Sequence, residues 1–337
     1  MASLRQLLDR EASALGFQHL RVAAVGEATP RIDAFDRWLA EGHHGDMQYL
    51  PRRRDERADP RLRLDGARSA VVLALEHHHL APPDPGGLTG RVARYAWGRD
   101  YHNLVGKRLK RLQRRLREHG IQCWGGVDTA PILERGWAEA AGLGFNGKNC
   151  VQILPAHGSW MFLAVLFIDQ HLEPDQPLPD HCGRCQRCLD ACPTQAFVGP
   201  RTLDARRCIA YWTIETRGVI PEAMRPGIGR WVFGCDDCQS VCPHNVTPPD
   251  SEEDDLLPRN AWLDLPWLLE TDDATLMEHF RGTPIRRPGP DALRRNACVV
   301  LGNLGDASAV PHLRMAVETQ SPLVQEHARW ALERLGG

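Results

Sequence analysis

The apolar residues of roughly the first 175 positions alternate between helical and strand-like spacing. Leucines between positions 4 and 15 predict an opening helix, and the apolar residues of 32–39 recur at three, six and seven positions from the first, which is one face of a helix. Short apolar runs at 70–75 and 121–127 predict strands. This alternation predicts an α/β or α+β domain with its own core.

Two further apolar segments, Val151–Leu154 and Trp160–Ile168, flank a stretch that contains Pro155 and Gly158. We expect these segments to pair as a hairpin. The second segment, nine residues long, is the longest apolar run of the chain, and a membrane helix would need ~20 residues. The N-terminus lacks the apolar stretch of a secretory signal, so we expect a cytoplasmic protein.

Two Pro-rich stretches divide the chain. Prolines at 174, 177 and 179 predict a linker, and Pro248–Pro249 with the acidic run 250–255 predicts a second boundary. We therefore expect three parts, at 1–175, 176–248 and 249–337.

The last part contains an internal repeat. The pattern Ala297-x3-Leu301-x2-Leu304-Gly305 recurs 31 residues later from Ala328. A small residue followed by Leu at +4 and +7 forms one buried helix face, and this period is typical of HEAT-like helical repeats. Because two copies bury little core alone, we expect the unit to pack on the preceding domain.

Eight of the eleven cysteines lie between positions 182 and 242. They form the runs Cys182-x-x-Cys185-x-x-Cys188-x-x-x-Cys192-Pro193 and Cys235-x-x-Cys238-x-x-x-Cys242-Pro243, with Cys208 between them. The first run is typical of bacterial two-cluster ferredoxins, in which the fourth Cys binds the other cluster. The pattern predicts two 4Fe–4S clusters, one held by Cys182, Cys185, Cys188 and Cys242 and the other by Cys192, Cys208, Cys235 and Cys238.

Structural zinc is the alternative for these cysteines, but zinc ribbons use two C-x-x-C pairs and the triple run favours iron–sulfur clusters. The lone Cys208 departs from a simple ferredoxin, which would repeat the triple run. Metal-binding cysteines indicate a reducing compartment. Of the remaining three, Cys123 and Cys298 are interpreted as small buried residues, and the role of Cys150 stays open.

Four N-terminal segments combine glycine, aromatic, charged and His residues too densely for a plain core. They are 42–49 (Gly-His-His-Gly-Asp-Met-Gln-Tyr), 94–102 (Arg-Tyr-Ala-Trp-Gly-Arg-Asp-Tyr-His), 127–135 (Val-Asp-Thr-Ala-Pro-Ile-Leu-Glu-Arg) and 144–150 (Gly-Phe-Asn-Gly-Lys-Asn-Cys). Asp128 follows a predicted strand. From the residues alone it is equally a proton donor or a cap of the following turn.

Together with the cysteines and the helical tail, these segments resemble the epoxyqueuosine reductase family of queuosine biosynthesis, from about residue 30 to the end. The resemblance implies cobalamin in an N-terminal domain somewhat like the nitroreductase fold. It also implies two 4Fe–4S clusters, and reduction of epoxyqueuosine at the wobble position of tRNA. The residues alone imply a two-cluster redox protein with an α/β partner domain.

The resemblance implies that Asp128 is the proton donor and lies at the cobalamin. Removing the epoxide oxygen to leave an alkene takes two electrons and two protons, and a carboxylic acid can protonate that oxygen as the C–O bond breaks. Such an acid needs a raised pKa near neutral pH, which burial beside a corrin would favour.

Further cobalamin contacts are implied less directly, through side chains, backbone groups or packing, at Arg57, Trp97, His102, Lys148, Gln152, Leu163 and Ala210. His102 is expected to be a hydrogen-bond partner rather than a cobalt ligand. Trp97 is as well explained by a place in the core. Ala210 lies two residues after Cys208, where cluster and corrin would meet.

A net charge of −2 excludes general adhesion to polyanions. Local basic stretches remain: seven Lys and Arg within 107–117, a group formed by Arg281, Arg286, Arg287, Arg294 and Arg295, and Arg52–Arg54. Because no acid relieves the first, phosphate binding is at least as well supported as a solvated helix face. We expect docking of one folded tRNA, an external low-potential electron donor and a monomeric chain.

Two other functions compete. A cobalamin-dependent reductive dehalogenase shares the cofactors but has no evident use for the basic helix and helical tail. A plain electron carrier would not need the large N-terminal domain.

Overall fold

The computed structural model describes residues 3–336, and its N-terminal region is built on a four-stranded antiparallel sheet. The order is β1 (His19–Ala24), β2 (Ser69–Glu76), β7 (Met161–Ile168) and β4 (Cys123–Gly126). All eight residues of β2 are buried and pair with β7, from Ser69 opposite Ile168 to Glu76 opposite Met161. The antiparallel pairing makes this region an α+β rather than a parallel α/β arrangement.

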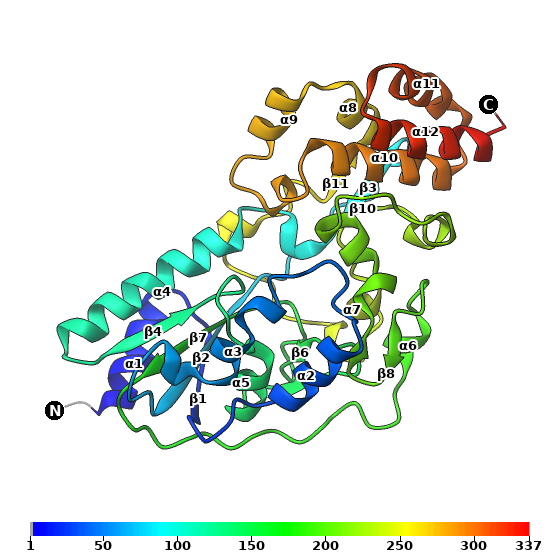
Figure 1. The fold of residues 1–337 in the computed structure, drawn as a ribbon. Helices are drawn as coiled ribbons and strands as arrows, with labels where there is room; N and C mark the ends of the chain where they lie inside the picture. Colours follow the sequence, from blue (N-terminus) through cyan, green and yellow to red (C-terminus); the bar gives the residue numbers. More distant parts are fainter. Residues whose placement is uncertain (1–2, 337) are drawn as a thin grey trace.

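Helices cover both faces of this sheet (Figure 1). The amphipathic helices α1 (Leu4–Ala14) and α4 (Tyr101–Glu118) bury their leucines against one face. Helix α5 (Glu134–Ala140) covers the other, where Trp137 meets Phe167 edge-to-face at 5.2 Å. Helices α2 (Ile32–Ala40) and α3 (Arg54–Ala58) lie in the connection from β1 to β2, so the predicted helices at 4–15 and 32–39 are confirmed.

The predicted hairpin is wrong. The short strand β6 (Gln152–Ile153) pairs with β5 (Phe145–Asn146), whereas β7 pairs with β2 and β4. A continuous apolar strand is typical of a central position, which requires a partner on each edge. The intervening turn closes with a single bridge between Leu154 and Gly158 and turns the chain into a different sheet.

The cysteine-rich segment contains only short elements: α6 (Arg187–Asp190), β8 (Phe197–Gly199), β9 (Thr202–Leu203), β10 (Trp231–Phe233) and α7 (Asp237–Ser240). Strand β10 pairs with β3 (Thr89–Val92), which also pairs with β11 (Trp262–Asp264). This second sheet therefore takes one strand from each of the three parts expected from the sequence. The boundaries predicted at 175 and 248 therefore divide the sequence, but they do not separate independently packed domains.

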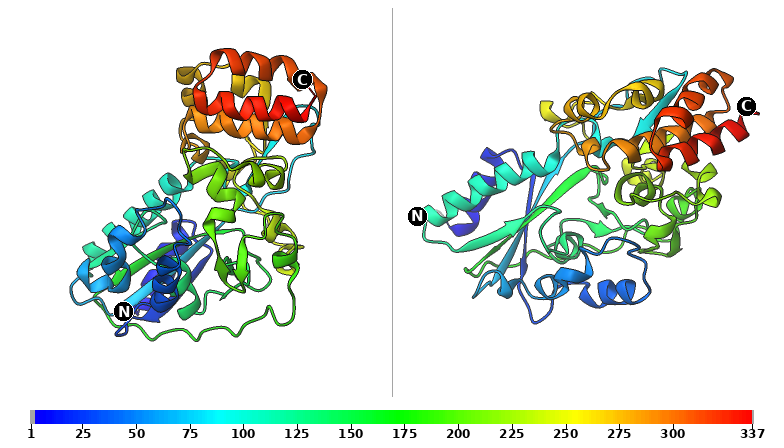
Figure 2. Two further views of the ribbon diagram at one scale, coloured as in Figure 1. Left: turned by 45° about the vertical axis from the view of Figure 1, so that its right-hand side comes forward. Right: turned by 45° about the horizontal axis from the view of Figure 1, so that its top comes forward.

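The C-terminal region is helical, with α8 (Leu265–Glu270), α9 (Asp273–His279), α10 (Pro290–Leu304), α11 (Val310–Thr319) and α12 (Pro322–Arg334). Figure 2 shows these helices stacked as a lobe on the rest of the molecule. The repeated alanines Ala297 and Ala328 are fully buried, and α10 packs on β10. The predicted buried faces and their packing on the preceding region are confirmed. Among residues 3–336, no helix is long and apolar enough to cross a membrane.

Candidate active site

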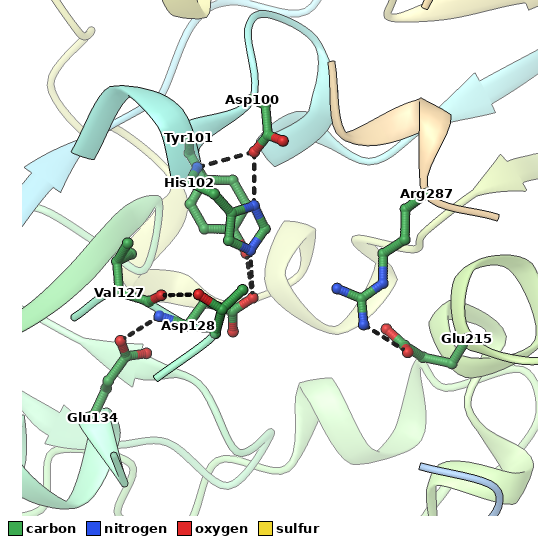
Figure 3. Close-up of polar contacts among 9 residues, drawn as sticks. Asp100, Tyr101, His102, Val127, Asp128, Glu134, Glu215 and Arg287 are labelled. Atoms are coloured by element: carbon green, nitrogen blue, oxygen red, sulfur yellow. Dashed lines mark hydrogen bonds and ion pairs between the residues drawn. The ribbon is translucent and has the colours of Figure 1, made fainter. Parts of the chain in front are cut away.

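Asp128 lies just beyond the end of β4, in a loop whose backbone is unusual. Its φ of +47° is in the left-handed region, which non-glycine residues rarely adopt. Its backbone N–H donates to the Glu134 carboxylate at 2.5 Å. The side chain is about half exposed, at 49%, and Figure 3 shows Arg287 across from it.

Two side chains from the first turn of α4 contact the Asp128 carboxylate. His102 Nε2 and the Tyr101 hydroxyl both lie 2.8 Å from Asp128 Oδ2. Asp100 caps the helix by accepting from the His102 N–H, and it also lies 2.7 Å from His102 Nδ1. Tyr101 stacks on Phe162 with ring centroids 4.2 Å apart. The helix start thus orients both groups toward Asp128.

These contacts set the charges of the site. Burial alone would raise the pKa of Asp128. The hydrogen bonds from His102 and Tyr101 and the charges of His102 and Arg287 lower it by more than burial raises it, so the net pKa is below the ordinary value. Burial lowers the pKa of His102, but Asp100 and Asp128 outweigh it and bring the pKa to about 9. The raised pKa expected for Asp128 beside a corrin stays a prediction, since in the protein alone the pKa is lowered and at neutral pH His102 holds the proton.

Glu134 is a second carboxyl group behind Asp128. Burial, and then the negative charge of Asp128, raise the pKa of Glu134 to about 8. It holds the backbone of the Asp128 loop rather than the Asp128 side chain, so its role in the arrangement is to position that loop.

The opposite wall comes from other parts of the chain. Arg287, between α9 and α10, is paired with Glu215 at 2.9 Å, and its guanidinium is turned toward Asp128 (Figure 3). Burial lowers the pKa of Arg287, while Glu215, Tyr49 and Asp128 raise it to a net increase. Burial and Glu215 raise the pKa of Tyr49 to about 12. A fixed positive charge therefore faces the acidic wall.

The structure brings the first four predicted cluster ligands together. Burial, then Cys182 and Cys242, raise the pKa of Cys188 to about 11, and the pKa of Cys242 is raised by burial, Cys182 and Cys185. Such mutual repulsion of thiolates requires close sulfur atoms, which a metal cluster would neutralise.

The other four predicted ligands also influence one another. The pKa of Cys238 is raised by burial and then by Cys208, with Cys192 also contributing. Burial, Asp237 and then Cys208 and Cys238 raise the pKa of Cys235. Because Cys188 also affects Cys238, the two groups of sulfurs are neighbours.

The 144–150 motif clamps the cluster loops. Lys148 Nζ donates to the carbonyls of Gly183 and Cys185 at 2.8 and 2.9 Å, and Asn149 Nδ2 donates to the Cys238 carbonyl at 3.1 Å. Two of the three donors of the Lys148 ammonium group are thus used by the cluster loop, and a contact of Lys148 with cobalamin stays a prediction.

The remaining predicted contacts differ in their surroundings. Trp97 is buried in the core and donates its indole N–H to the Val92 carbonyl at 2.7 Å, which favours the core interpretation. Arg57 is buried and donates to the carbonyls of Leu50 and Arg53.

Three further residues were predicted to contact cobalamin, through a side chain, the backbone or packing. Gln152 donates to the Leu143 carbonyl, while its buried Oε1 has no partner among the described residues. Leu163 lies on β7 beyond the last residue paired with β4, which is Val165. Ala210 precedes the π-helix η5 (Tyr211–Glu215), and its backbone N–H lowers the pKa of Cys208.

The basic groups separate into surface and interior residues. On α4, Lys107, Lys110, Arg111 and Arg114 are exposed. Arg294 and Arg295 are 4% and 0% exposed, and Arg295 donates to three backbone carbonyls, so these two are structural and not a nucleic-acid surface. Burial and Arg217 lower the pKa of Arg295 to about 9.

Three residues of the site were not assigned to it from the sequence. Glu134 lies within a motif quoted for its composition, and Arg287 within a basic group interpreted as RNA-facing. Glu215 has no local signal, because only the fold brings η5 beside Arg287.

Known families cover two parts of the chain. Residues 57–129 match the family described as Epoxyqueuosine reductase QueG, DUF1730, and residues 181–245 match the 4Fe-4S double cluster binding domain. The second match supports two clusters in the cysteine-rich segment.

Curated relatives and solved structures span nearly the whole chain. The epoxyqueuosine reductase of Synechococcus sp. (strain CC9605) is 43% identical over 87% of this chain and 93% of its own, and that of Escherichia coli (strain K12) is 37% identical over 98% and 89%. An epoxyqueuosine reductase crystallised with a tRNA-Tyr epoxyqueuosine-modified tRNA stem loop superimposes with a TM-score of 0.91 at 32% identity, covering 99% of this chain and 90% of that one. The Bacillus subtilis enzyme, whose structure has its catalytic aspartate loop swung out of the active site, gives 0.89 at 31%, covering 99% and 91%. The chain belongs to the epoxyqueuosine reductase family.

Proposed function

We propose that this chain reduces epoxyqueuosine in tRNA to queuosine, with Asp128 delivering a proton to the epoxide oxygen. The observation that supports this role most directly is the half-exposed carboxylate of Asp128, held by His102 and Tyr101 and faced by Arg287. The reaction consumes two electrons and two protons: both C–O bonds break, an alkene forms, and the oxygen leaves as water.

The pKa values of His102 and Asp128 indicate which of the two carries the proton before the reaction starts. Because the pKa of His102 is about 9 and that of Asp128 is lowered, the neutral-pH pair is an imidazolium bonded to a carboxylate. As negative charge develops on the epoxide oxygen, a proton can pass from His102 through Asp128 Oδ2 to that oxygen. Tyr101 keeps the carboxylate oriented during the transfer.

The two electrons have to reach the epoxide beside Asp128 from an external donor. The two groups of four cysteines would hold 4Fe–4S clusters, which pass electrons singly. The clusters would receive those electrons from an external low-potential donor. The group of Cys192, Cys208, Cys235 and Cys238 is the one linked to the site along the chain, because Cys208 lies just before η5 and Glu215.

The residues present also fit a cobalamin. Corrin side chains end in amides, and the buried oxygens of Gln152 and Asn146 and the Nδ1 of His44 lack partners among the described residues. Gln152, the backbone near Leu163 beyond the end of β4, and Ala210 beside Cys208 would hold the group. When bound, cobalamin supplies low-potential cobalt for reductive C–O cleavage.

The exposed lysines and arginines of α4 would receive the tRNA backbone. Helix α4 begins at the active site with Tyr101 and His102 and runs away from it, so phosphate contacts along Lys107, Lys110 and Arg114 would deliver one end of an RNA to Asp128. The modified base must be turned out of its stack to reach the carboxylate.

The test uses anaerobic, cluster-loaded protein with cobalamin, a low-potential reductant and tRNA carrying epoxyqueuosine. Mass spectrometry of the digested nucleosides should show a product one oxygen lighter. Asp128→Asn should abolish most of the conversion, while Asp65→Asn, which changes an exposed aspartate outside the site, should not. If loaded parent protein forms no product, the proposed reaction is wrong; if Asp128→Asn converts at the parent rate, the assigned role of Asp128 is wrong.

A further inference from the structure

A second cluster of titratable side chains lies at one end of the main sheet, outside the site described above. His19 begins β1, Glu76 ends β2, and His157 lies in the turn between β6 and β7. His19 Nε2 and His157 Nδ1 both approach Glu76 Oε1, at 2.9 and 2.6 Å. The two imidazole rings meet edge-to-face with centroids 4.6 Å apart.

The fold fixes all three positions. His19 pairs with Ala74 across antiparallel strands, and residues two apart on a strand share a face, so His19 and Glu76 are diagonal neighbours on one face. His157 is held by the turn that closes between Leu154 and Gly158. A side chain at Gly158 would lie 2.2 Å from Asn245 Oδ1, so glycine there allows the turn to approach the segment after Cys242.

Two contacts hold the backbone at Glu76. The Glu76 N–H donates to Gln18 Oε1 at 3.2 Å, and Ser251 Oγ donates to the Glu76 carbonyl at 2.8 Å. They fix the end of β2, from which the Glu76 side chain projects. Glu76 is 7% exposed, whereas the His157 side chain is 37% exposed, which provides an entry path from solvent.

From this geometry we infer that His19, Glu76 and His157 form a site for a divalent transition metal of the Zn²⁺ class. Two imidazoles and one carboxylate are a ligand set that zinc uses with water in the fourth position. The three ligand atoms lie within 4.8 Å of one another, and side-chain shifts of about 1 Å would bring them to the ~2.0–2.2 Å bonds of zinc. The bound ion would replace both hydrogen bonds to Glu76 Oε1.

The metal would join the edge strand of the N-terminal sheet to the cluster region. The turn that carries His157 leads directly into Ser159, whose N–H donates to Asn245 Oδ1 at 2.7 Å. Asn245 follows the cluster ligand Cys242 by three residues. Metal binding at His157 would therefore hold the position of the segment that carries the predicted cluster ligand Cys242.

The test uses full-length protein whose iron content shows that both clusters are loaded, so that zinc does not occupy free cysteines. Zinc is titrated calorimetrically, and zinc and iron are counted by mass spectrometry after gel filtration. We expect one zinc per chain with unchanged iron, and a rise in melting temperature with zinc, because a ligand that binds only the folded state stabilises it.

Three variants decide the outcome. His157→Ala, at a partly exposed side chain, and Glu76→Gln, which keeps the shape of the side chain, should each lose the zinc and the rise in melting temperature. His171→Ala, at an exposed histidine outside the cluster, should retain both. If parent protein binds no zinc, or if His157→Ala and Glu76→Gln bind as much as the parent, the three residues are an ion-pair cluster and the metal site is refuted.

Discussion

Replacing Asp128 by Asn tests the proton pair most directly, because it keeps the size of the side chain and removes its charge. His102 has a pKa of about 9 against an ordinary value of 6.5. A difference of about 2.5 units corresponds to ~3 kcal/mol of preference for the charged imidazole. Two carboxylates, Asp100 and Asp128, contact the His102 ring and together stabilise its charged form.

Asp128 contributes less than Asp100 to the raised pKa of His102. Its side chain is 49% exposed, and water screens exposed charge pairs to about 1 kcal/mol or less. Asp128→Asn should therefore lower the pKa of His102 by about one unit, with Asp100 keeping it above the ordinary value. The loss of the delivering group should cost about 10²–10⁴-fold in rate.

The assay is the single-turnover rate of epoxyqueuosine reduction between pH 6 and 10. Because the pKa of His102 is raised, its proton is fully present below pH 6.5 and is lost as the pH rises through about 9. The parent rate should fall above pH 9, and His102→Gln should lack that limb. A rate for Asp128→Asn within threefold of the parent, or a parent rate that stays flat through pH 10, would refute the proton pair.

Three other substitutions have separate readouts. Lys148→Met removes two hydrogen bonds to the cluster loop and should lower iron content and speed bleaching of the cluster absorbance in air; unchanged iron and bleaching would contradict the clamp. Arg295→Met leaves three buried carbonyls unpaired and should cost about 3 kcal/mol or more of stability, measured by thermal unfolding. The control Arg281→Met, at a 71% exposed side chain, should cost less than about 0.5 kcal/mol. Equal melting temperatures for the two variants would contradict this. Arg287→Gln should raise the KM for modified tRNA more than it lowers kcat, and an unchanged KM would remove Arg287 from the substrate wall.

The elements that the sequence predicts well are those that packing on one face determines. The run at 70–75 becomes β2 because every position is buried, and the segment at 32–39 becomes α2 through its helical face. The hairpin prediction fails because an apolar run reveals burial but not the partner strand. Trp160–Ile168 pairs with strands far away in the chain, and no local spacing encodes that choice.

The site divides in the same way. Asp128 and His102 could be found because each lies in a motif beside a predicted strand or helix start. The ionisation of Asp128 could not, because it depends on hydrogen bonds from α4 that exist only after folding. Arg294 and Arg295 were misassigned for a related reason: composition shows the charge of a side chain but not whether backbone carbonyls bury it.

One short segment connects the electron and proton sides of the site. Cys208 precedes η5, and η5 ends at Glu215, which holds Arg287 opposite Asp128. A π-helix is a rare element that is frequent at functional sites. Glu215 lies seven residues after Cys208, so one short segment carries both a predicted cluster ligand and the group that holds Arg287. We therefore expect loss of the cluster that Cys208 would bind to weaken tRNA binding as well as electron transfer.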